Sequence, residues 1–156
     1  MKKFLVKLFQ KGQLQIVEKS EEICNAYVKK SASNFDSAKI LLENNKLEEA
    51  VSLIYYSMYN LVVALLFKVG VKSENHTASI FLLKEVFNIE NSEIVNAKKE
   101  RIDKQYYVDF GVTKKEVDEM LKIAEEFNRN IKGFLSGLNL ESIEGYRNKI
   151  KEIVNE

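Results

Sequence analysis

The 156-residue sequence contains no proline and only six glycines. Both residues interrupt helices, because proline lacks a backbone N–H and glycine loses the most entropy on folding. Their scarcity therefore favours long helices. One cysteine, Cys24, excludes an internal disulfide, and one histidine, His76, excludes a zinc site built from several histidines. We expect neither a metal nor another cofactor.

An excess of charge is also missing, since 24 Lys and Arg residues balance 23 Asp and Glu residues. With a formal net charge of +1, the chain has no bulk electrostatic attraction to nucleic acid or to a membrane surface. Any contact with nucleic acid must then use a local patch. The sequence also lacks a Gly-rich phosphate loop, a paired-His metalloprotease motif and a nucleophile elbow.

The most distinctive stretch is the range 50–67, which carries no charged residue and has apolar residues on nearly every helical face. Such a helix is either the centre of a bundle or a membrane span. Its midpoint holds Tyr55, Tyr56, Tyr59 and Asn60. Spanning helices usually carry tyrosine at their ends, so we expect a soluble bundle core and no membrane contact.

Amphipathic segments flank this stretch on both sides. The helix before it begins after Ser20, a good N-cap, and its apolar positions predict a buried face. Gly70 is suited to the position just after the last residue of the central helix. Later in the chain, Thr113 and Glu116 form a capping box that predicts the start of another helix. The buried face predicted for the helix after Ser20 consists of Ile23, Tyr27, Phe35, Ala38, Leu41 and Leu42.

These patterns predict an all-α fold, an up-and-down antiparallel helical bundle of four to five main helices plus a short N-terminal helix. We expect residues 1–19 to be an N-terminal appendage and residues 20–156 to form a single domain. Residues 13–17 alternate weakly and could be extended, whereas residues 72–75 read as a loop. The expected helices cover about residues 2–11, 20–44, 46–69, 76–87, 93–110, 113–138 and 141–154.

The first ten residues superficially suggest a signal peptide. Their apolar core is short, is interrupted by Lys7, and is not followed by a small-residue cleavage site. We therefore expect a cytoplasmic protein.

Three groups of residues could carry chemistry. His76 stands at a predicted helix N-terminus, where an imidazole and free N–H groups could meet an anion, although a surface residue near a cap would look the same. The second group is the polar band of the central helix, Tyr55, Tyr56, Tyr59 and Asn60, whose buried hydroxyls and amide need hydrogen-bond partners. Such a network could serve the core alone. The third group is dense in hydrogen-bonding and stacking side chains but could equally be a solvated helix face: Arg101, Asp103, Lys104, Tyr106 and Tyr107.

These residues resemble a known family. The run Ala50-Val-x-x-x-Tyr-Tyr-Ser-Met-Tyr-Asn60, the turn Gly70-Val-Lys-Ser-x-x-His76, and Arg101 with Tyr106 are similar to prokaryotic stand-alone members of the HEPN domain family. The resemblance covers roughly residues 20–110. It implies a helical bundle that usually dimerises and is often encoded beside a minimal nucleotidyltransferase, in toxin–antitoxin or related pairs.

Many members of that family are metal-independent ribonucleases with an Arg-x4–6-His signature at a dimer interface. Here Tyr106 stands where the signature would place histidine, and no arginine precedes His76 at the right distance. Tyrosine has a reference pKa of about 10 and is a poorer acid–base group than histidine at neutral pH. On an ideal helix, Arg101 and Tyr106 also point about 140° apart.

Three hypotheses remain open. The chain could bind a nucleotide or RNA, usually beside a partner protein. It could instead be a ribonuclease toxin with a rearranged catalytic site of His76, Arg101 and Tyr106. It could also be a structural module for dimerisation or partner capture. The residues expected to bind nucleotide or RNA are Asn60, His76, Arg101, Asp103, Lys104, Tyr106 and Tyr107.

Overall fold

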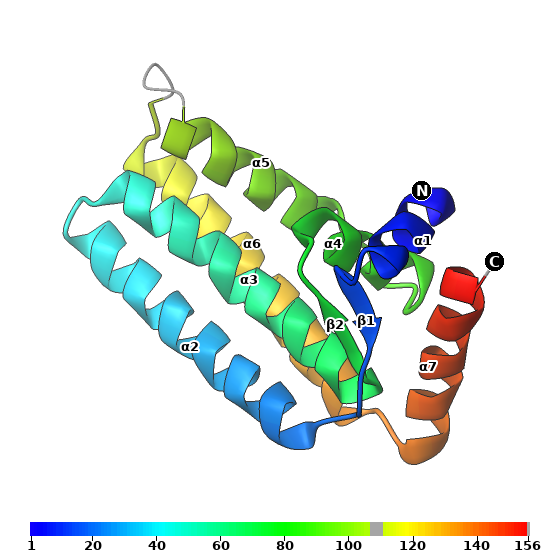
Figure 1. The fold of residues 1–156 in the computed structure, drawn as a ribbon. Coiled ribbons are helices and arrows are strands. Elements are labelled where there is room, and N and C mark those ends of the chain that lie inside the picture. The colour runs from blue at the N-terminus through cyan, green and yellow to red at the C-terminus, as the bar shows by residue number, and fades with distance from the viewer. Residues whose placement is uncertain (107–110, 156) are drawn as a thin grey trace.

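A computed structural model of the chain describes residues 1–106 and 111–155, except for the side chains of residues 105 and 106. The described residues form seven helices and two short strands (Figure 1). The prediction of an all-α bundle with a short N-terminal helix is confirmed. In chain order the elements are α1 (Lys2–Gln10), β1 (Leu14–Ile16), α2 (Glu21–Glu43), α3 (Leu47–Val69), β2 (Val71–Ser73), α4 (His76–Glu85), α5 (Ser92–Tyr106), α6 (Lys114–Ser136) and α7 (Leu140–Asn155).

Helix α3 lies at the centre of the bundle, beside α2, α5 and α6 (Figure 1). Most of its side chains are buried, including Val51, Ile54, Met58, Leu61 and Leu65 along one stripe. Within the described part of the chain, α3 is the only helix long and apolar enough to cross a membrane, and 72% of its most apolar window is buried. Its apolar side chains therefore build the core of this fold.

The helix ends follow the capping residues seen in the sequence. The Ser20 side chain accepts a hydrogen bond from the Ile23 amide at 3.0 Å, which caps α2. Thr113 and Glu116 form both hydrogen bonds of the capping box that opens α6. Gly70 ends α3 with a φ of 81°, in the left-handed region that glycine adopts without a steric penalty.

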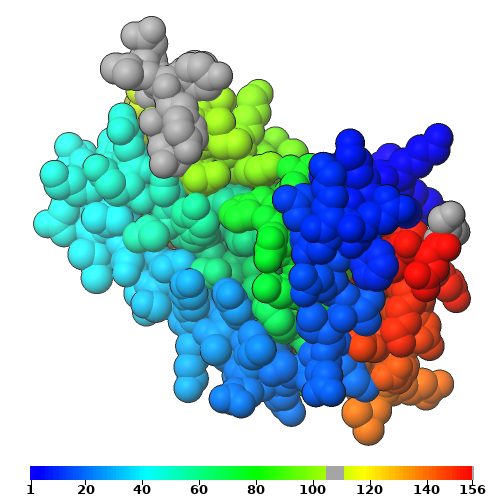
Figure 2. Space-filling model, in the orientation of Figure 1, coloured from blue at the N-terminus to red at the C-terminus, as the bar shows by residue number. Residues whose placement is uncertain are grey.

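The strands β1 and β2 pair antiparallel, with Leu14 opposite Ser73 and Ile16 opposite Val71. The prediction of a loop over residues 72–75 is wrong at its start, because Lys72 and Ser73 belong to β2. The strand forms because the left-handed turn at Gly70 brings the chain alongside β1, a partner that is remote in sequence. Figure 2 shows the N-terminal residues in blue against this green segment.

The N-terminal segment contributes to the same hydrophobic core as the bundle. Leu5 and Leu14 have no exposed surface, and Leu8 is 5% exposed. All three belong to one cluster with the buried residues of α3 and α7. Residues 1–19 therefore pack into the bundle through their leucines.

The buried face of α2 differs in part from the prediction. Ile23 is exposed, whereas Cys24 and Ser31 are buried and Ala38 is buried as predicted. These three small residues recur at intervals of one heptad, which lets α2 approach α3 closely. The Ser31 hydroxyl uses that closeness to donate a hydrogen bond to the carbonyl of Ser57. Leu42 is buried as predicted, whereas Tyr27, Phe35 and Leu41 are half-buried.

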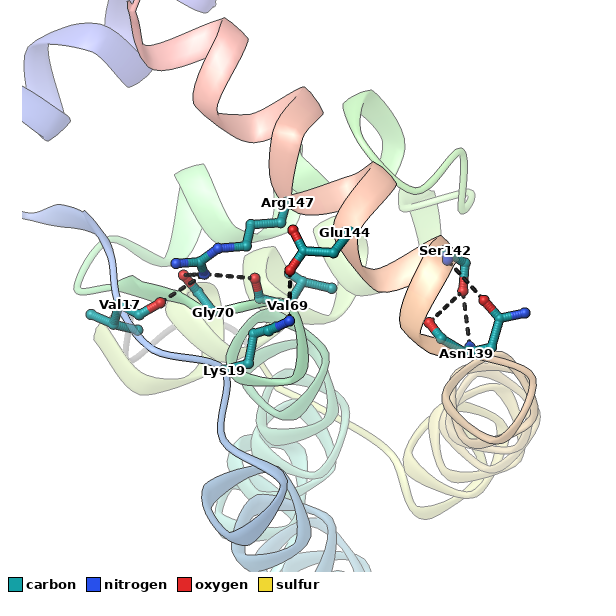
Figure 3. A network of polar contacts seen from close by, with 8 residues as sticks. All are labelled: Val17, Lys19, Val69, Gly70, Asn139, Ser142, Glu144 and Arg147. Carbon is teal, nitrogen blue, oxygen red and sulfur yellow. Dashed lines mark hydrogen bonds and ion pairs between the residues drawn. The ribbon is translucent and has the colours of Figure 1, made fainter.

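Helix α7 is held against the C-terminus of α3 by Arg147 (Figure 3). Its Nη1 atom donates hydrogen bonds to the carbonyl oxygens of Val17 at 2.7 Å, Gly70 at 2.9 Å and Val69 at 3.1 Å. Two of these carbonyls belong to the end of α3, where the helix dipole favours a cation. Arg147 therefore ties α7 to the turn that leads from α3 into β2.

Candidate functional site

The polar band of α3 is satisfied largely by the first two turns of α4. Tyr55 has no exposed surface and Tyr59 is 6% exposed, so their hydroxyls need partners inside the protein. The Tyr55 hydroxyl lies 2.7 Å from Nδ1 of His76, and the Tyr59 hydroxyl lies 3.1 Å from Oγ of Ser79. The apolar α3 therefore carries tyrosines whose hydroxyls fix the position of α4.

His76 is the first residue of α4, and its imidazole is held on two sides. The Asn75 side chain accepts a hydrogen bond from the Ala78 amide at 2.9 Å and so starts the helix at His76. The imidazole stacks on the Tyr59 ring, with centroids 3.8 Å apart and planes inclined by 13°. The stacking and the Tyr55 hydrogen bond together fix the ring in one orientation.

Arg101 reaches the same tyrosines from α5. Its guanidinium carbon lies 5.2 Å from the centroid of the Tyr55 ring and 5.4 Å from that of Tyr56. Its Nη1 atom also donates a hydrogen bond to the Tyr56 hydroxyl at 3.4 Å. His76 and Arg101 are therefore brought together on one pair of aromatic rings. We call Tyr55, Tyr56, Tyr59, His76 and Arg101 the tyrosine–histidine cluster.

The electrostatics of the cluster keep His76 neutral. Burial lowers the pKa of His76 below its usual 6.5, and the positive charges of Arg101 and Lys98 lower this pKa further. Burial also raises the pKa of Tyr55, so its hydroxyl stays protonated. Within the described part of the chain, His76 is the hydrogen-bond partner of that hydroxyl.

The proton of the neutral imidazole can then be assigned. Either group could donate across the contact between the Tyr55 hydroxyl and Nδ1 of His76. Because the Tyr55 hydroxyl is protonated and fully buried, we infer that it donates to Nδ1, which places the imidazole proton on Nε2. In this tautomer Nε2 offers a hydrogen-bond donor rather than a base. The arrangement is suited to holding an anionic oxygen, and it disfavours proton abstraction by His76.

Lys98 adds a second cation on the same face of α5 as Arg101, three residues away. Its Nζ atom donates a hydrogen bond to Oγ1 of Thr77 at 2.7 Å, so it lies at the N-terminal turn of α4. Burial, followed by the charge of Arg101, lowers the pKa of Lys98. Two neighbouring cations and a helix N-terminus make this edge of the cluster attractive to an anion.

An open cavity of about 470 Å³ adjoins the cluster between α2 and α3, and we call it the α2–α3 groove. Tyr56, Tyr59 and His76 line it and also belong to the cluster. Arg101 contacts Tyr56 but does not line the groove. The remaining lining residues include aromatic, cationic and amide side chains: Tyr27, Lys30, Asn34, Asn60, Phe67 and Lys72.

The other predicted site residues of α5 lie further along the helix. Asp103 is half-buried, and Nζ of Lys104 donates a hydrogen bond to the carbonyl of Gly111 at 3.0 Å. Lys104 is thus directed toward the segment after α5. Tyr106 is the last residue of α5, but its side chain and the whole of Tyr107 lie outside the described residues. Among the described residues, no three His, Cys, Asp or Glu side chains are grouped to hold a metal ion.

Sequence reasoning missed several residues of the site. The helical spacing of Lys98 and Arg101 places both on one face and could have identified Lys98. No sequence signal indicated that Lys30 and Lys72 line one groove, because they lie on α2 and β2. Their proximity depends on how the bundle packs.

Comparison with known proteins places this geometry in a family context. The family model described as HEPN domain matches residues 24–133, more than half of the chain. The matched range contains α3, α4 and α5, which together carry the tyrosine–histidine cluster. No curated relative matches the sequence.

Proposed function

Because the chain belongs to the HEPN domain family, we propose that it binds a nucleotide or an RNA strand at the tyrosine–histidine cluster and the adjoining α2–α3 groove. Membership of this family supports a nucleotide- or RNA-related role. The observation that carries the proposal is that His76 and Arg101 contact the same pair of tyrosines beside an aromatic groove.

Each part of a nucleotide has a counterpart in this site. Arg101 and Lys98 offer positive charge to a phosphate, and Nε2–H of His76 offers a donor beside them. The aromatic side chains of the groove offer faces on which a base can stack. A short strand can therefore place its phosphates along the edge of α5 and α4 and a base in the groove.

Binding is favoured over cleavage by the protonation of the cluster. A ribonuclease needs a group near neutral pKa that gives or takes a proton. His76 is neutral with its Nδ1 occupied, and the pKa of Tyr55 is raised. Tyr55 is fully buried against His76 and so is not placed to exchange a proton with a ligand, whereas His76 lines the groove and can contact one.

Calorimetric titration of the purified chain with nucleoside monophosphates and short RNA oligonucleotides, at one low salt concentration, tests the proposal. Arg101→Ala should weaken binding about tenfold or more, because a charge-assisted contact is lost. Arg129→Ala is the matched control, since Arg129 is exposed on α6. Absence of binding by the wild type, or equal binding by Arg101→Ala, would overturn the proposal.

Cleavage is tested separately with total RNA and a chelator. The proposal expects intact RNA at high protein concentration. Metal-independent cleavage that is lost in both His76→Ala and Arg101→Ala would replace binding with catalysis as the function.

We further propose that the protein works in the cytoplasm as a homodimer beside a nucleotidyltransferase-type partner, in a toxin–antitoxin or related module. The family resemblance supports this part. Light scattering of the purified chain should give the mass of a dimer, and affinity capture from the native cells should recover the nucleotidyltransferase. A monomer that captures no such enzyme would contradict it.

A further inference from the structure

Asn60 is a buried amide that the fold itself does not satisfy. The residue is 5% exposed, and its Nδ2 atom has no hydrogen-bond acceptor among the described residues. Buried side-chain amides are normally paired, so an unpaired one calls for an explanation. Asn60 also lines the α2–α3 groove, so its buried amide lies at the wall of that cavity.

The groove around Asn60 has walls that fit a flat aromatic ligand. Tyr27 of α2 stacks on Phe67 of α3, with centroids 5.9 Å apart and planes inclined by 10°, so the two rings together form one aromatic side of the groove. Both rings line the groove together with Tyr56 and Tyr59, the neighbour of Asn60 on α3. At about 470 Å³, the groove falls within the usual size range of small-molecule sites.

Cations stand at the rim of the same groove. Nζ of Lys30 lies 5.7 Å from the centroid of the Tyr27 ring. Lys72 of β2 also lines the groove and forms an ion pair at 3.5 Å with Glu74, another lining residue. In a strand whose base lies at Asn60, this rim would take a phosphate next to the one proposed for Arg101 and Lys98. The combination describes a nucleotide better than a purely apolar compound.

We infer that Asn60 reads the edge of a nucleobase bound in the α2–α3 groove, which makes it a specificity-determining residue. This inference rests on the proposed function and names the part of the ligand that the groove takes. A carboxamide carries a donor and an acceptor side by side, and base edges present the same pairing. A ligand without a base would leave the amide unpaired.

A comparison with Asn128 distinguishes this role from a structural one. Asn128 is also 5% exposed, and its Oδ1 atom lacks a hydrogen-bond partner among the described residues, but its Nδ2 atom donates a hydrogen bond to Oγ of Ser57 at 3.2 Å. Replacing Asn128 by leucine removes a core hydrogen bond and should lower the melting temperature. Replacing Asn60 by leucine removes an amide with an unpaired donor, and the melting temperature should stay the same or rise.

The decisive test compares ligands on the wild-type protein. Calorimetry with AMP, CMP, GMP, UMP and ribose 5-phosphate should show that at least one nucleotide binds about tenfold more tightly than another. Ribose 5-phosphate should bind more weakly than the preferred nucleotide. Equal affinities for the four nucleotides would overturn the inference while leaving the proposed function intact. Absence of all binding would overturn the proposed function as well.

Variants then assign the preference to Asn60. Asn60→Leu and Asn60→Asp should remove or reorder the preference among the bases and leave the affinity for ribose 5-phosphate unchanged. Arg129→Ala, which changes an exposed residue of α6 outside the groove, should keep the wild-type order. An unchanged order in Asn60→Leu and Asn60→Asp, or a melting temperature that falls as much in Asn60→Leu as in Asn128→Leu, would contradict the assignment.

Discussion

The Tyr59 ring and the His76 imidazole lie nearly parallel, with their centroids 3.8 Å apart. Tyr55, one turn earlier on α3, hydrogen-bonds the edge of the same imidazole at 2.7 Å. The central helix therefore holds the only histidine of the chain by its face and by its edge. A single imidazole gives one set of signals in an NMR spectrum, so His76 can report on the whole cluster.

The first prediction concerns the pKa of His76. NMR titration should give a value below the usual 6.5, because burial and then the charges of Arg101 and Lys98 disfavour the protonated ring. Arg101→Ala should raise this pKa, yet leave it below 6.5, since burial is the largest cause. Arg129→Ala should leave it unchanged. A wild-type pKa above 6.5 would contradict this description of the site.

The same shift makes folding stability depend on pH. Because the His76 pKa is lower in the folded chain than in the unfolded chain, the unfolded chain binds more protons. The contribution of His76 is therefore complete above about pH 6.5 and is lost as the pH falls toward its folded pKa. Urea unfolding at pH 7.5 and 5.5 should show a larger loss for the wild type than for His76→Gln. An equal loss in both proteins would count against this linkage.

The second prediction concerns the tautomer of His76. Nitrogen chemical shifts should place the proton on Nε2 in the wild type, because the protonated Tyr55 hydroxyl donates to Nδ1. Tyr55→Phe should give a mixture of tautomers. Tyr59→Phe is the control, since the Tyr59 hydroxyl bonds Ser79 instead. A wild-type proton on Nδ1 would reverse the roles assigned to the two groups.

The third prediction concerns Arg147, which donates to three carbonyl oxygens at the junction of α3 and β2. Arg147→Ala should lower the free energy of unfolding by about 2–3 kcal/mol, because charged hydrogen bonds to partly buried carbonyls are lost. Arg147→Lys keeps the charge but not the planar guanidinium group, so its free energy of unfolding should lie between those of the wild type and Arg147→Ala. Chemical denaturation measures the free energy of unfolding of both variants. If Arg147→Ala is as stable as the wild type within error, Arg147 has no anchoring role.

The fourth prediction compares two glycines with positive φ. Gly70 has a φ of 81° and Gly12 a φ of 73°, so alanine is strained at both. A Cβ at Gly70 would also lie 2.6 Å from the carbonyl oxygen of Val17 and would overlap Nη1 of Arg147, whereas at Gly12 the nearest atom is 3.8 Å away. Gly12→Ala should lower the free energy of unfolding by about 1–2 kcal/mol. Gly70→Ala should lower the free energy of unfolding clearly more in the same denaturation experiment. Equal losses in the two variants would contradict the close contacts found at Gly70.

Much of the fold could be predicted because its signals are local. The uncharged run of α3 indicates a buried helix whatever its neighbours are, and Thr113 with Glu116 marks the start of α6 within four consecutive residues. Apolar periodicity alone does not show how closely two helices approach. For this reason the small residues of α2, such as Cys24 and Ser31, were not recognised as its contact face.

Features that join distant segments could not be predicted in the same way. The pairing of β1 with β2 and the contacts of Arg147 with Val17 both depend on the packed bundle. The site shows the same division. His76 and Arg101 were identifiable as candidates, but their meeting on Tyr55 and Tyr56 required the positions of three helices.

The most direct test of the account follows the His76 imidazole by NMR while a short RNA oligonucleotide or a nucleotide is added. The account predicts that the His76 signals shift and saturate with the binding isotherm measured by calorimetry. In Arg101→Ala the same shifts should require about tenfold more ligand. Saturating binding that leaves the His76 signals unmoved would place the ligand elsewhere, and no binding at any concentration would contradict the proposed function.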